Sequence, residues 1–179
     1  MRVEQTFKVW SGISPTAFCD DVIARASDVA WISDISGNAW VFQPLANLIA
    51  TTNRKFWGWN MSGRETTQYT RYGEGQFCDW HMDARKKPYP EDGQWGGLAR
   101  KISISVNLSD PADYEGGDFE IEETTPTPLR SDRRLQTLEG LRERGSAIVF
   151  PAHMHHRVTP VTRGMRRSLV DWFLGPPFV

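Results

Sequence analysis

Strict alternation of apolar and polar side chains along residues 101–109 is the feature that most limits what this chain can fold into. The apolar positions are the even-numbered ones: Ile102, Ile104, Val106 and Leu108. The polar positions lie between them: Ser103, Ser105 and Asn107. Because successive side chains of a β-strand point to opposite faces, this pattern predicts a strand with one face on a hydrophobic layer and the other on something polar.

Short β-type runs separated by turn residues continue through the second half of the chain. Residues 66–72 and 76–82 flank a glycine-containing turn at residues 73–75, which predicts a hairpin. Further strands are expected at residues 118–121, 146–150, 156–161 and 167–173.

Two helices are expected before these strands. The first starts at Ser14 and Pro15, a favourable N-cap and first helical residue, and then shows apolar residues at helical spacing: Phe18, Val22, Ala26 and Val29. The second covers residues 45–55. Two helices followed by seven or eight antiparallel strands favour a helix-supported barrel or a double-sheet jelly roll.

Residues 122–144 interrupt the strand pattern with five acidic and five basic residues. Leu135, Leu138 and Leu141 recur there at a spacing of three, which predicts a short surface helix after Ser131. The segment reads as a solvated insertion or as a functional lid.

Length and composition narrow the class of protein. A chain of 179 residues is expected to form a single domain over 1–179, with helical support in residues 1–60 and the β core in residues 61–179. A net charge of -1 and the lack of long apolar runs argue against a nucleic-acid or membrane partner. The distant Cys19 and Cys78, and the absence of a secretory pattern at the N-terminus, make the cytoplasm the expected location.

His81-Met82-Asp83 is the first candidate site. At the end of a strand, period-two geometry directs an imidazole and a carboxylate two residues apart to the same side. A third ligand from the histidine cluster at residues 153–156 would complete a set of two histidines and one carboxylate, which is typical of non-haem Fe(II) oxygenases. The alternative is a surface or hydrogen-bonded histidine beside an unrelated aspartate.

The second candidate is the segment of residues 156–168. A turn near Arg163 and Gly164 predicts a hairpin that brings Arg166 and Ser168 close to His156. A buried guanidinium needs an anionic partner, and a dicarboxylate that also binds the metal would supply one. The alternative reading of Arg166 is a surface arginine.

The sequence resembles the 2-oxoglutarate- and Fe(II)-dependent dioxygenases, in particular the prolyl-4-hydroxylase-like group with the bacterial PKHD-type hydroxylases. The resemblance covers roughly residues 29–176 and lies in blocks that follow one another in order: YGEG at 72–75, WHMD at 80–83, RKIS at 100–103, LSDPADYEGGD at 108–118, FP at 150–151 and residues 156–172. It implies a mainly β double-stranded β-helix (jelly roll, cupin-like) with supporting N-terminal helices.

Residue roles follow from the same resemblance. It implies that His81, Asp83 and His156 bind Fe(II), and that Arg166, ten residues after His156, binds the far carboxylate of 2-oxoglutarate. Two further residues are implied in co-substrate binding: Tyr72 and Ser168. The serine and asparagine side chains of residues 103–107 would face the cavity. O2 is the second co-substrate, and ascorbate (vitamin C) is a candidate additional factor.

His153 and His155 depart from the family pattern, which carries small or hydroxyl residues there. They are expected to be partly exposed beside the site, and the alternative is a second metal or a proton relay.

The substrate is the open question at this point. Residues 84–100 follow the first two ligands directly, contain several glycines and prolines, and are expected to form a mobile loop at the mouth of the site. The leading expectation is hydroxylation of a prolyl or other residue in a peptide or protein. Alternatives are a free amino acid or small metabolite, a zinc hydrolase with the same ligands, and a non-catalytic cupin-like binding module. The oligomeric state is unknown.

Overall fold

The computed structural model describes residues 7–25, 30–32, 39–127 and 130–178. It contains two α-helices, α1 (Thr16–Arg25) and α2 (Ala39–Phe56). Helix α1 begins where Ser14 and Pro15 predict it, whereas the predicted contacts of Ala26 and Val29 lie outside the described residues. Helix α2 begins before the predicted start, because buried Val41 and Phe42 extend its apolar face across Pro44.

The β-structure falls into three sheets in which every pairing is antiparallel. The strands of the large sheet are β1 (Lys8–Trp10), β2 (Ala30–Ile32), β3 (Gly63–Arg64), β4 (Thr67–Tyr72), β6 (Ala99–Asn107), β10 (Ala147–Pro151) and β13 (Arg166–Gly175). Those of the small sheet are β5 (Cys78–His81), β8 (Phe119–Thr127), β9 (Arg130–Thr137) and β11 (His156–Val158). A two-stranded sheet pairs β7 (Tyr114–Gly116) with β12 (Val161–Gly164).

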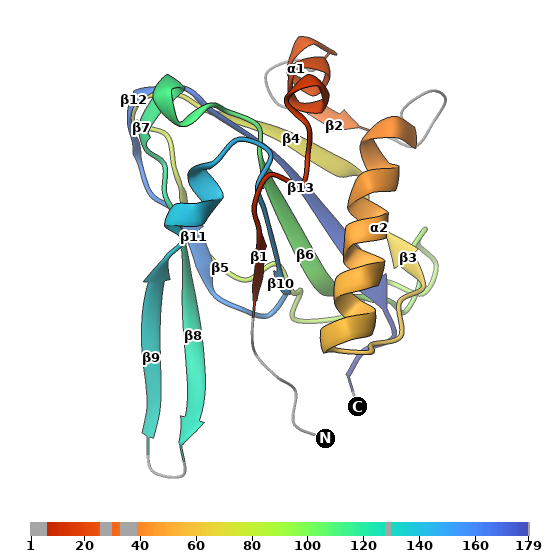
Figure 1. Cartoon of the computed structure of the whole chain (residues 1–179). Coiled ribbons are helices and arrows are strands. Elements are labelled where there is room, and N and C mark those ends of the chain that lie inside the picture. The colour runs from red at the N-terminus through yellow and green to blue at the C-terminus, as the bar shows by residue number, and fades with distance from the viewer. Residues whose placement is uncertain (1–6, 26–29, 33–38, 128–129, 179) are drawn as a thin grey trace.

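The large sheet, with β1-β10-β6-β13-β4-β2 in order, carries the helices on one face (Figure 1). Its main core joins Leu45 and Ile49 of α2 to the apolar side chains of β6. Ile102, Ile104, Val106 and Leu108 are all fully buried there, so the strand and its hydrophobic face are confirmed. Strands β1 and β2 show that the first 60 residues contribute sheet edges as well as helices.

A second core lies between the large and the small sheets. It contains Ile148 and Phe150 of β10 together with Phe119 and Ile121 of β8 and Val158 of β11. Their neighbours on β10, Ala147 and Val149, point the other way into the helix-covered core. The alternation of a strand buried on both faces therefore assigns its side chains to two different cores.

Three local predictions are wrong in their pairing or type. Strands β4 and β5 do not form a hairpin, because β4 pairs with β13 and β5 pairs with β11 of the other sheet. Of the helix expected after Ser131, residues 130–137 are instead strand β9, paired with β8 in a ribbon that extends from the body of the protein (Figure 1), and only residues 139–142 are helical. Strand β12 pairs with β7, so the hairpin expected around Arg163 and Gly164 is not formed with β13.

Two short 3-10 helices complete the described elements: η1 (Pro111–Asp113) and η2 (Glu139–Arg142). Helix η2 follows the β8–β9 ribbon and buries Leu141 in the core between the sheets. The predicted insertion is therefore an extended ribbon whose end is part of the folded body. Among the described residues, no helix has the length and apolar character needed to span a membrane.

We expect Arg64→Gln to lower the free energy of unfolding more at pH 8 than at pH 5. Arg64 Nη1 lies 3.0 Å from Oδ2 of Asp171, which is fully buried. Burial raises the pKa of Asp171 to about 6, although Arg64 and Thr67 act against this. Above that pH the variant leaves a buried carboxylate without its ion pair, at a cost of about 3–5 kcal/mol in the free energy of unfolding. At pH 5 the carboxyl is largely protonated, so the variant lowers the free energy of unfolding by less.

The sign follows from linkage. The folded pKa of Asp171 lies above its unfolded value, so its contribution to stability falls as the pH rises through the range between the two, and the variant extends this fall to higher pH. Urea unfolding at both pH values measures the difference. Arg163→Gln, in an exposed pair with Glu115, is the control and changes stability by no more than about 1 kcal/mol. Equal losses at the two pH values for Arg64→Gln would contradict this account.

Candidate active site

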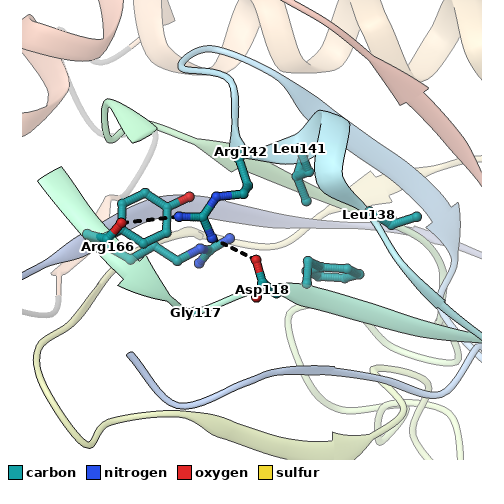
Figure 2. A pocket seen from close by; sticks show the side chains of 8 residues that line it. Gly117, Asp118, Leu138, Leu141, Arg142 and Arg166 are labelled. Atoms are coloured by element: carbon teal, nitrogen blue, oxygen red, sulfur yellow. Dashed lines mark hydrogen bonds and ion pairs between the residues drawn. The ribbon is translucent and has the colours of Figure 1, made fainter. Parts of the chain in front are cut away.

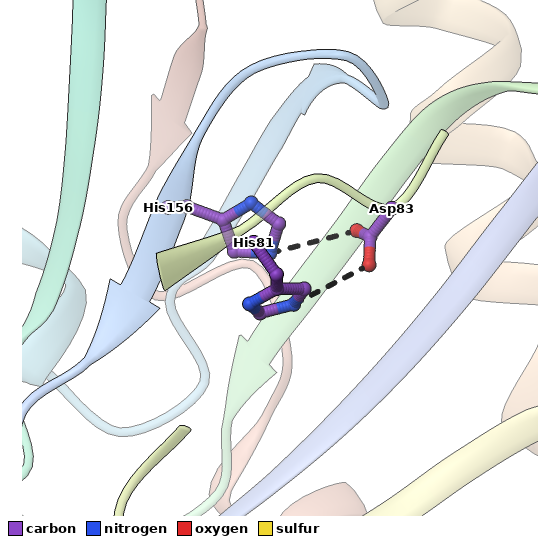
Figure 3. Close-up of side chains that lie close together, drawn as sticks. All are labelled: His81, Asp83 and His156. Carbon is purple, nitrogen blue, oxygen red and sulfur yellow. Dashed lines mark ion pairs between the residues drawn. The ribbon is translucent and has the colours of Figure 1, made fainter. Parts of the chain in front are cut away.

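Two histidines from neighbouring strands face each other at one end of the small sheet. His81 is the last residue of β5, His156 is the first of β11, and the two are partners in the strand register. Their ring centroids are 4.2 Å apart. Asp83 follows β5 by two residues and directs its carboxylate at both rings (Figure 3). Residues that lie about 75 positions apart in sequence therefore converge, as the sequence predicts.

The three side chains offer one donor atom each to a common point. Nε2 of His81 lies 3.7 Å from Oδ1 of Asp83, and Nε2 of His156 lies 3.6 Å from Oδ2. The donor atoms all lie within 4.8 Å of one another. These separations suit ligands of one metal ion, since metal–nitrogen and metal–oxygen bonds are about 2.0–2.2 Å long. Oδ2 of Asp83 is buried and has no hydrogen-bond partner among the described residues, as suits an oxygen that ligates a cation.

Backbone carbonyl groups set the orientation of both imidazoles. Nδ1 of His81 lies 2.7 Å from the carbonyl oxygen of Asp79, and Nδ1 of His156 lies 3.0 Å from that of Met154. A carbonyl can only accept a hydrogen bond, so Nδ1 of each ring is the donor. In the neutral rings this leaves the Nε2 lone pairs directed at Asp83, as in histidine ligands held by a supporting hydrogen bond.

Burial differs between the two rings. His156 is 5% exposed; its ring stacks on Phe119, with centroids 5.4 Å apart, and meets the edge of Phe150 at 4.7 Å. This burial lowers the pKa of His156 and favours the neutral form that binds metals. The His81 side chain is 38% exposed, so the cluster has one open side.

The charges of the cluster call for a cation. The Asp83 carboxylate and, next, the Cys78 thiol raise the pKa of His81 to about 10. Burial acts to raise the pKa of Asp83, but the two imidazoles and Ser103 hold it below its usual value. A proton on His81 thus takes the place that a metal ion would fill, and the donor set of two imidazoles and one carboxylate fits Fe(II).

Arg166 is a buried cation without a carboxylate partner among the described residues. It is the first residue of β13, it is 2% exposed, and its Nη1 donates to Oγ of Ser168 at 3.3 Å. Burial lowers the pKa of Arg166, and the nearby Tyr114 and Tyr72 act in the opposite direction. Tyr72 is its register partner on β4, and the Tyr72 ring centroid lies 5.9 Å from Cζ of Arg166. Such a group is costly unless an anion joins it.

A small pocket surrounds this guanidinium (Figure 2). Its polar lining comprises Arg166, Tyr114, Arg142 and Asp118, but the Asp118 carboxylate is occupied by Nη1 of Arg142 at 2.7 Å. Gly117 allows the backbone to approach the Arg166 side chain closely. A Cβ atom there would lie 3.0 Å from Cδ of Arg166, and the residue has a φ of +62°. Phe119 lines this pocket and also stacks on His156, so one residue contacts both parts of the site.

The polar residues of β6 have different roles. Ser103, Ser105 and Asn107 are buried, as expected for a stripe that faces inward, but only Ser103 affects Asp83. The Asn107 amide instead donates to the carbonyl oxygens of Ser109 and Arg142, which makes its role structural.

His153 and His155 do not join the cluster of three. His153 is half-buried near the ring of Phe178, and Nδ1 of His155 lies 3.3 Å from Oε2 of Glu122. Sequence reasoning missed other residues of the site, namely Tyr114, Arg142, Phe119 and Cys78, whose Sγ lies 3.6 Å from Nδ1 of His81. Tyr114 lies in the YEGGD segment, which was the one available signal.

Known proteins with related sequences are PKHD-type hydroxylases. The chain is 40% identical over 97 residues to one from Sphingopyxis alaskensis, a match that covers 54% of this chain and 38% of the relative. It is 36% identical over 104 residues to one from a Caulobacter species, covering 58% of this chain and 40% of the relative. The matches therefore span about two fifths of the length of these curated relatives.

Solved structures with a similar fold include prolyl hydroxylases. A Pseudomonas putida prolyl-4-hydroxylase has a TM-score of 0.67 at 20% identity, covering 98% of this chain and 90% of that one. The viral collagen prolyl hydroxylase of Paramecium bursaria Chlorella virus-1 also has a TM-score of 0.67, at 16% identity, covering 96% and 97%. This likeness confirms the predicted double-stranded β-helix.

A family model covers the part of the chain that holds the site. The model of the 2OG-Fe(II) oxygenase superfamily matches residues 67–174, which include both histidines, the aspartate and the buried arginine. The chain therefore belongs to the 2OG-Fe(II) oxygenase superfamily.

Proposed function

We propose that this protein is a 2-oxoglutarate- and Fe(II)-dependent dioxygenase that hydroxylates an unactivated carbon, with a prolyl or other residue of a peptide or protein as its substrate. One observation carries the proposal. Phe119 stacks on a histidine of a three-residue cluster whose donor atoms suit one cation, and it also lines the pocket of a buried guanidinium that has no carboxylate partner among the described residues. A dicarboxylate that binds a metal at one end satisfies both at once.

His81, Asp83 and His156 would hold Fe(II) on one face and leave the opposite positions open. When bound, iron and 2-oxoglutarate supply oxygen activation, in which O2, 2-oxoglutarate and the substrate yield succinate, carbon dioxide and an alcohol. Arg166 would hold the far carboxylate of 2-oxoglutarate through two parallel hydrogen bonds. Tyr72 and Ser168 flank that guanidinium and would orient the same group.

The aromatic surroundings exclude water from the buried side. Phe119 and Phe150 cover His156, while the half-exposed His81 marks the side from which a substrate can approach. Exposed Met82 lies between His81 and Asp83 in sequence, exposed Phe77 directly precedes β5, and both would offer apolar contact to a substrate. A dry site of this kind protects a reactive oxidant from side reactions.

A peptide substrate is supported by relatives rather than by this chain alone. One structural neighbour is a prolyl hydroxylase from Trichoplax adhaerens in complex with a peptide fragment of hypoxia inducible factor, at a TM-score of 0.67 and 15% identity. The segment of residues 84–98 follows Asp83 directly and is exposed along much of its length, which suits a loop that contacts a peptide. Hydroxylation of a free amino acid is the alternative, and a requirement for ascorbate (vitamin C) stays a prediction.

His81→Ala and Asp83→Ala are expected to weaken Fe(II) binding by more than about 100-fold, since even residues that only support a ligand contribute about 10- to 100-fold. Anaerobic equilibrium dialysis measures the affinity, and circular dichroism checks that the fold is retained. His155→Ala, which changes a histidine outside the cluster, is the matched control and should bind Fe(II) as the unaltered protein does. Normal binding by both ligand variants would contradict the metal site.

Arg166→Gln is expected to raise the KM for 2-oxoglutarate by about 30-fold or more, because breaking a desolvated charge pair costs about 2–5 kcal/mol. Arg167→Gln changes the same charge on the opposite face of β13 and serves as the control. The affinity for 2-oxobutyrate, which lacks the far carboxylate, should differ much less between Arg166→Gln and the unaltered protein. An unchanged KM in Arg166→Gln would place the anchor elsewhere.

We expect 2-oxoglutarate consumption to rise with proline-containing peptides and to stay at its basal level with free amino acids. Succinate formation by iron-loaded protein in air, screened against a peptide library and against the free amino acids, measures this. Stimulation by free amino acids alone would reverse the substrate assignment. Hydrolysis of a substrate by the zinc-loaded protein, with no succinate formed by the iron-loaded protein, would favour a hydrolase. Neither hydrolysis nor succinate formation under any condition would favour a cupin-like binding module.

A further inference from the structure

The carboxylate of Glu65 is a buried junction beside the active site. Glu65 lies between β3 and β4 and is 5% exposed. It accepts two hydrogen bonds from Arg100, from Nε and Nη2, each at 2.6 Å. Its Oε1 also accepts a hydrogen bond from the Tyr89 hydroxyl at 2.6 Å. Neither the metal cluster nor the Arg166 pocket uses this carboxylate.

One branch of the junction leads to a metal ligand. The Arg100 guanidinium donates to Glu65 from two of its nitrogens, and the third nitrogen, Nη1, donates to the backbone carbonyl of Asp83 at 3.3 Å. The guanidinium also lies over the ring of Trp172, with Cζ 4.1 Å from the centroid. Arg100 is thus fixed on two sides, and its remaining donor holds the backbone of the carboxylate ligand.

The other branch leads to the loop after Asp83. Tyr89 lies in the segment of residues 84–98, where its N–H donates to the carbonyl of Leu98 at 2.8 Å and its carbonyl accepts from Gly97 at 3.1 Å. The Tyr89 ring packs against Trp95, with centroids 5.0 Å apart, and the Arg85 guanidinium lies 4.6 Å from its centroid. The hydroxyl of Tyr89 therefore anchors the middle of this loop to Glu65.

We propose that Glu65 is a positioning residue that couples the loop of residues 84–98 to the metal ligand Asp83. This inference rests on the proposed function, because it assigns the loop to the substrate side of a metal site. The buried carboxylate fixes Arg100, Arg100 fixes the Asp83 backbone, and Tyr89 fixes the loop to Oε1 of the same carboxylate. A substrate that moves the loop therefore acts on the placement of Asp83 through charge-assisted hydrogen bonds.

The two branches can be separated by substitution. Glu65→Gln removes the charge at the junction and disturbs both branches. Arg100→Lys keeps a positive charge next to Glu65 but removes the planar fork that reaches Asp83. Tyr89→Phe removes only the hydroxyl that anchors the loop. Glu115→Gln, in an exposed ion pair with Arg163, is the matched control for loss of a carboxylate.

Two measurements that need no turnover report on the two branches. Anaerobic titration gives the Kd for Fe(II), and limited trypsin digestion after the exposed Arg85 and Lys86 reports on the loop. Glu65→Gln and Arg100→Lys are expected to weaken Fe(II) binding by about 10- to 100-fold. Glu65→Gln and Tyr89→Phe are expected to speed cleavage several-fold, and Tyr89→Phe is expected to weaken Fe(II) binding measurably but less than Glu65→Gln does, because the loop acts on Asp83 only through Glu65.

The pattern across variants decides the inference. A Kd for Fe(II) within about twofold of the unaltered protein in both Glu65→Gln and Arg100→Lys would overturn it, as would unchanged cleavage in both Glu65→Gln and Tyr89→Phe. If one variant of a pair does not fold, the other variant of that pair decides. If the unaltered protein bound neither Fe(II) nor 2-oxoglutarate, the proposed function would fail together with this inference.

Discussion

Asp83 is a buried negative charge with too few hydrogen-bond donors, and the arrangement around it follows from that constraint. The residue is 7% exposed, one carboxylate oxygen has no partner among the described residues, and its nearest polar groups are imidazole nitrogens. The Nδ1 protons of His81 and His156 are committed to backbone carbonyls, so the neutral rings present lone pairs to the carboxylate. A cation between the three groups resolves this conflict, and a proton on His81 is the substitute that the chain itself offers.

Arg166 poses the same problem with the opposite sign. The guanidinium is buried at the start of β13, and the one carboxylate in its pocket, Asp118, is held by Arg142. Phe119 lines that pocket and also stacks on His156. A carboxylate with one unpartnered oxygen beside two imidazoles, and a buried guanidinium whose printed hydrogen bond is to a serine hydroxyl, suit the proposed ligand, which brings a metal at one end and a carboxylate at the other.

The sequence predicted those features that depend on local periodicity. The alternation of residues 101–109 located β6 and its buried face, and the spacing of His81 and Asp83 placed both on one side. Strand pairing was not predictable in this way, because a glycine-containing turn indicates that the chain reverses but not which strand is its partner. Strands β4 and β5 therefore separate into different sheets. A leucine spacing of three likewise fits a helix, but pairing with β8 made the part around Leu135 a strand, and only the part around Leu141 is helical.

Single polar residues escaped prediction for a related reason. Tyr114, Arg142 and Glu65 have no spacing that marks them, and each acquires its role only from a partner distant in sequence, such as Arg100 for Glu65. The choice of His156 from three neighbouring histidines depended on the family resemblance, while its burial against Phe119 supplies the physical reason. Residues that act through long-range contacts become visible only in the folded structure.

The two faces of the large sheet divide stability from function. The outer face of β6 and β13 packs Ile102, Ile104 and Leu169 against the helices, where burial of apolar area stabilises the fold. The inner face carries buried polar groups, including Arg166 and Ser103, which cost stability where they lack partners. Such groups persist because the well-packed outer layer tolerates their cost, and because a ligand can satisfy them only if the protein itself does not.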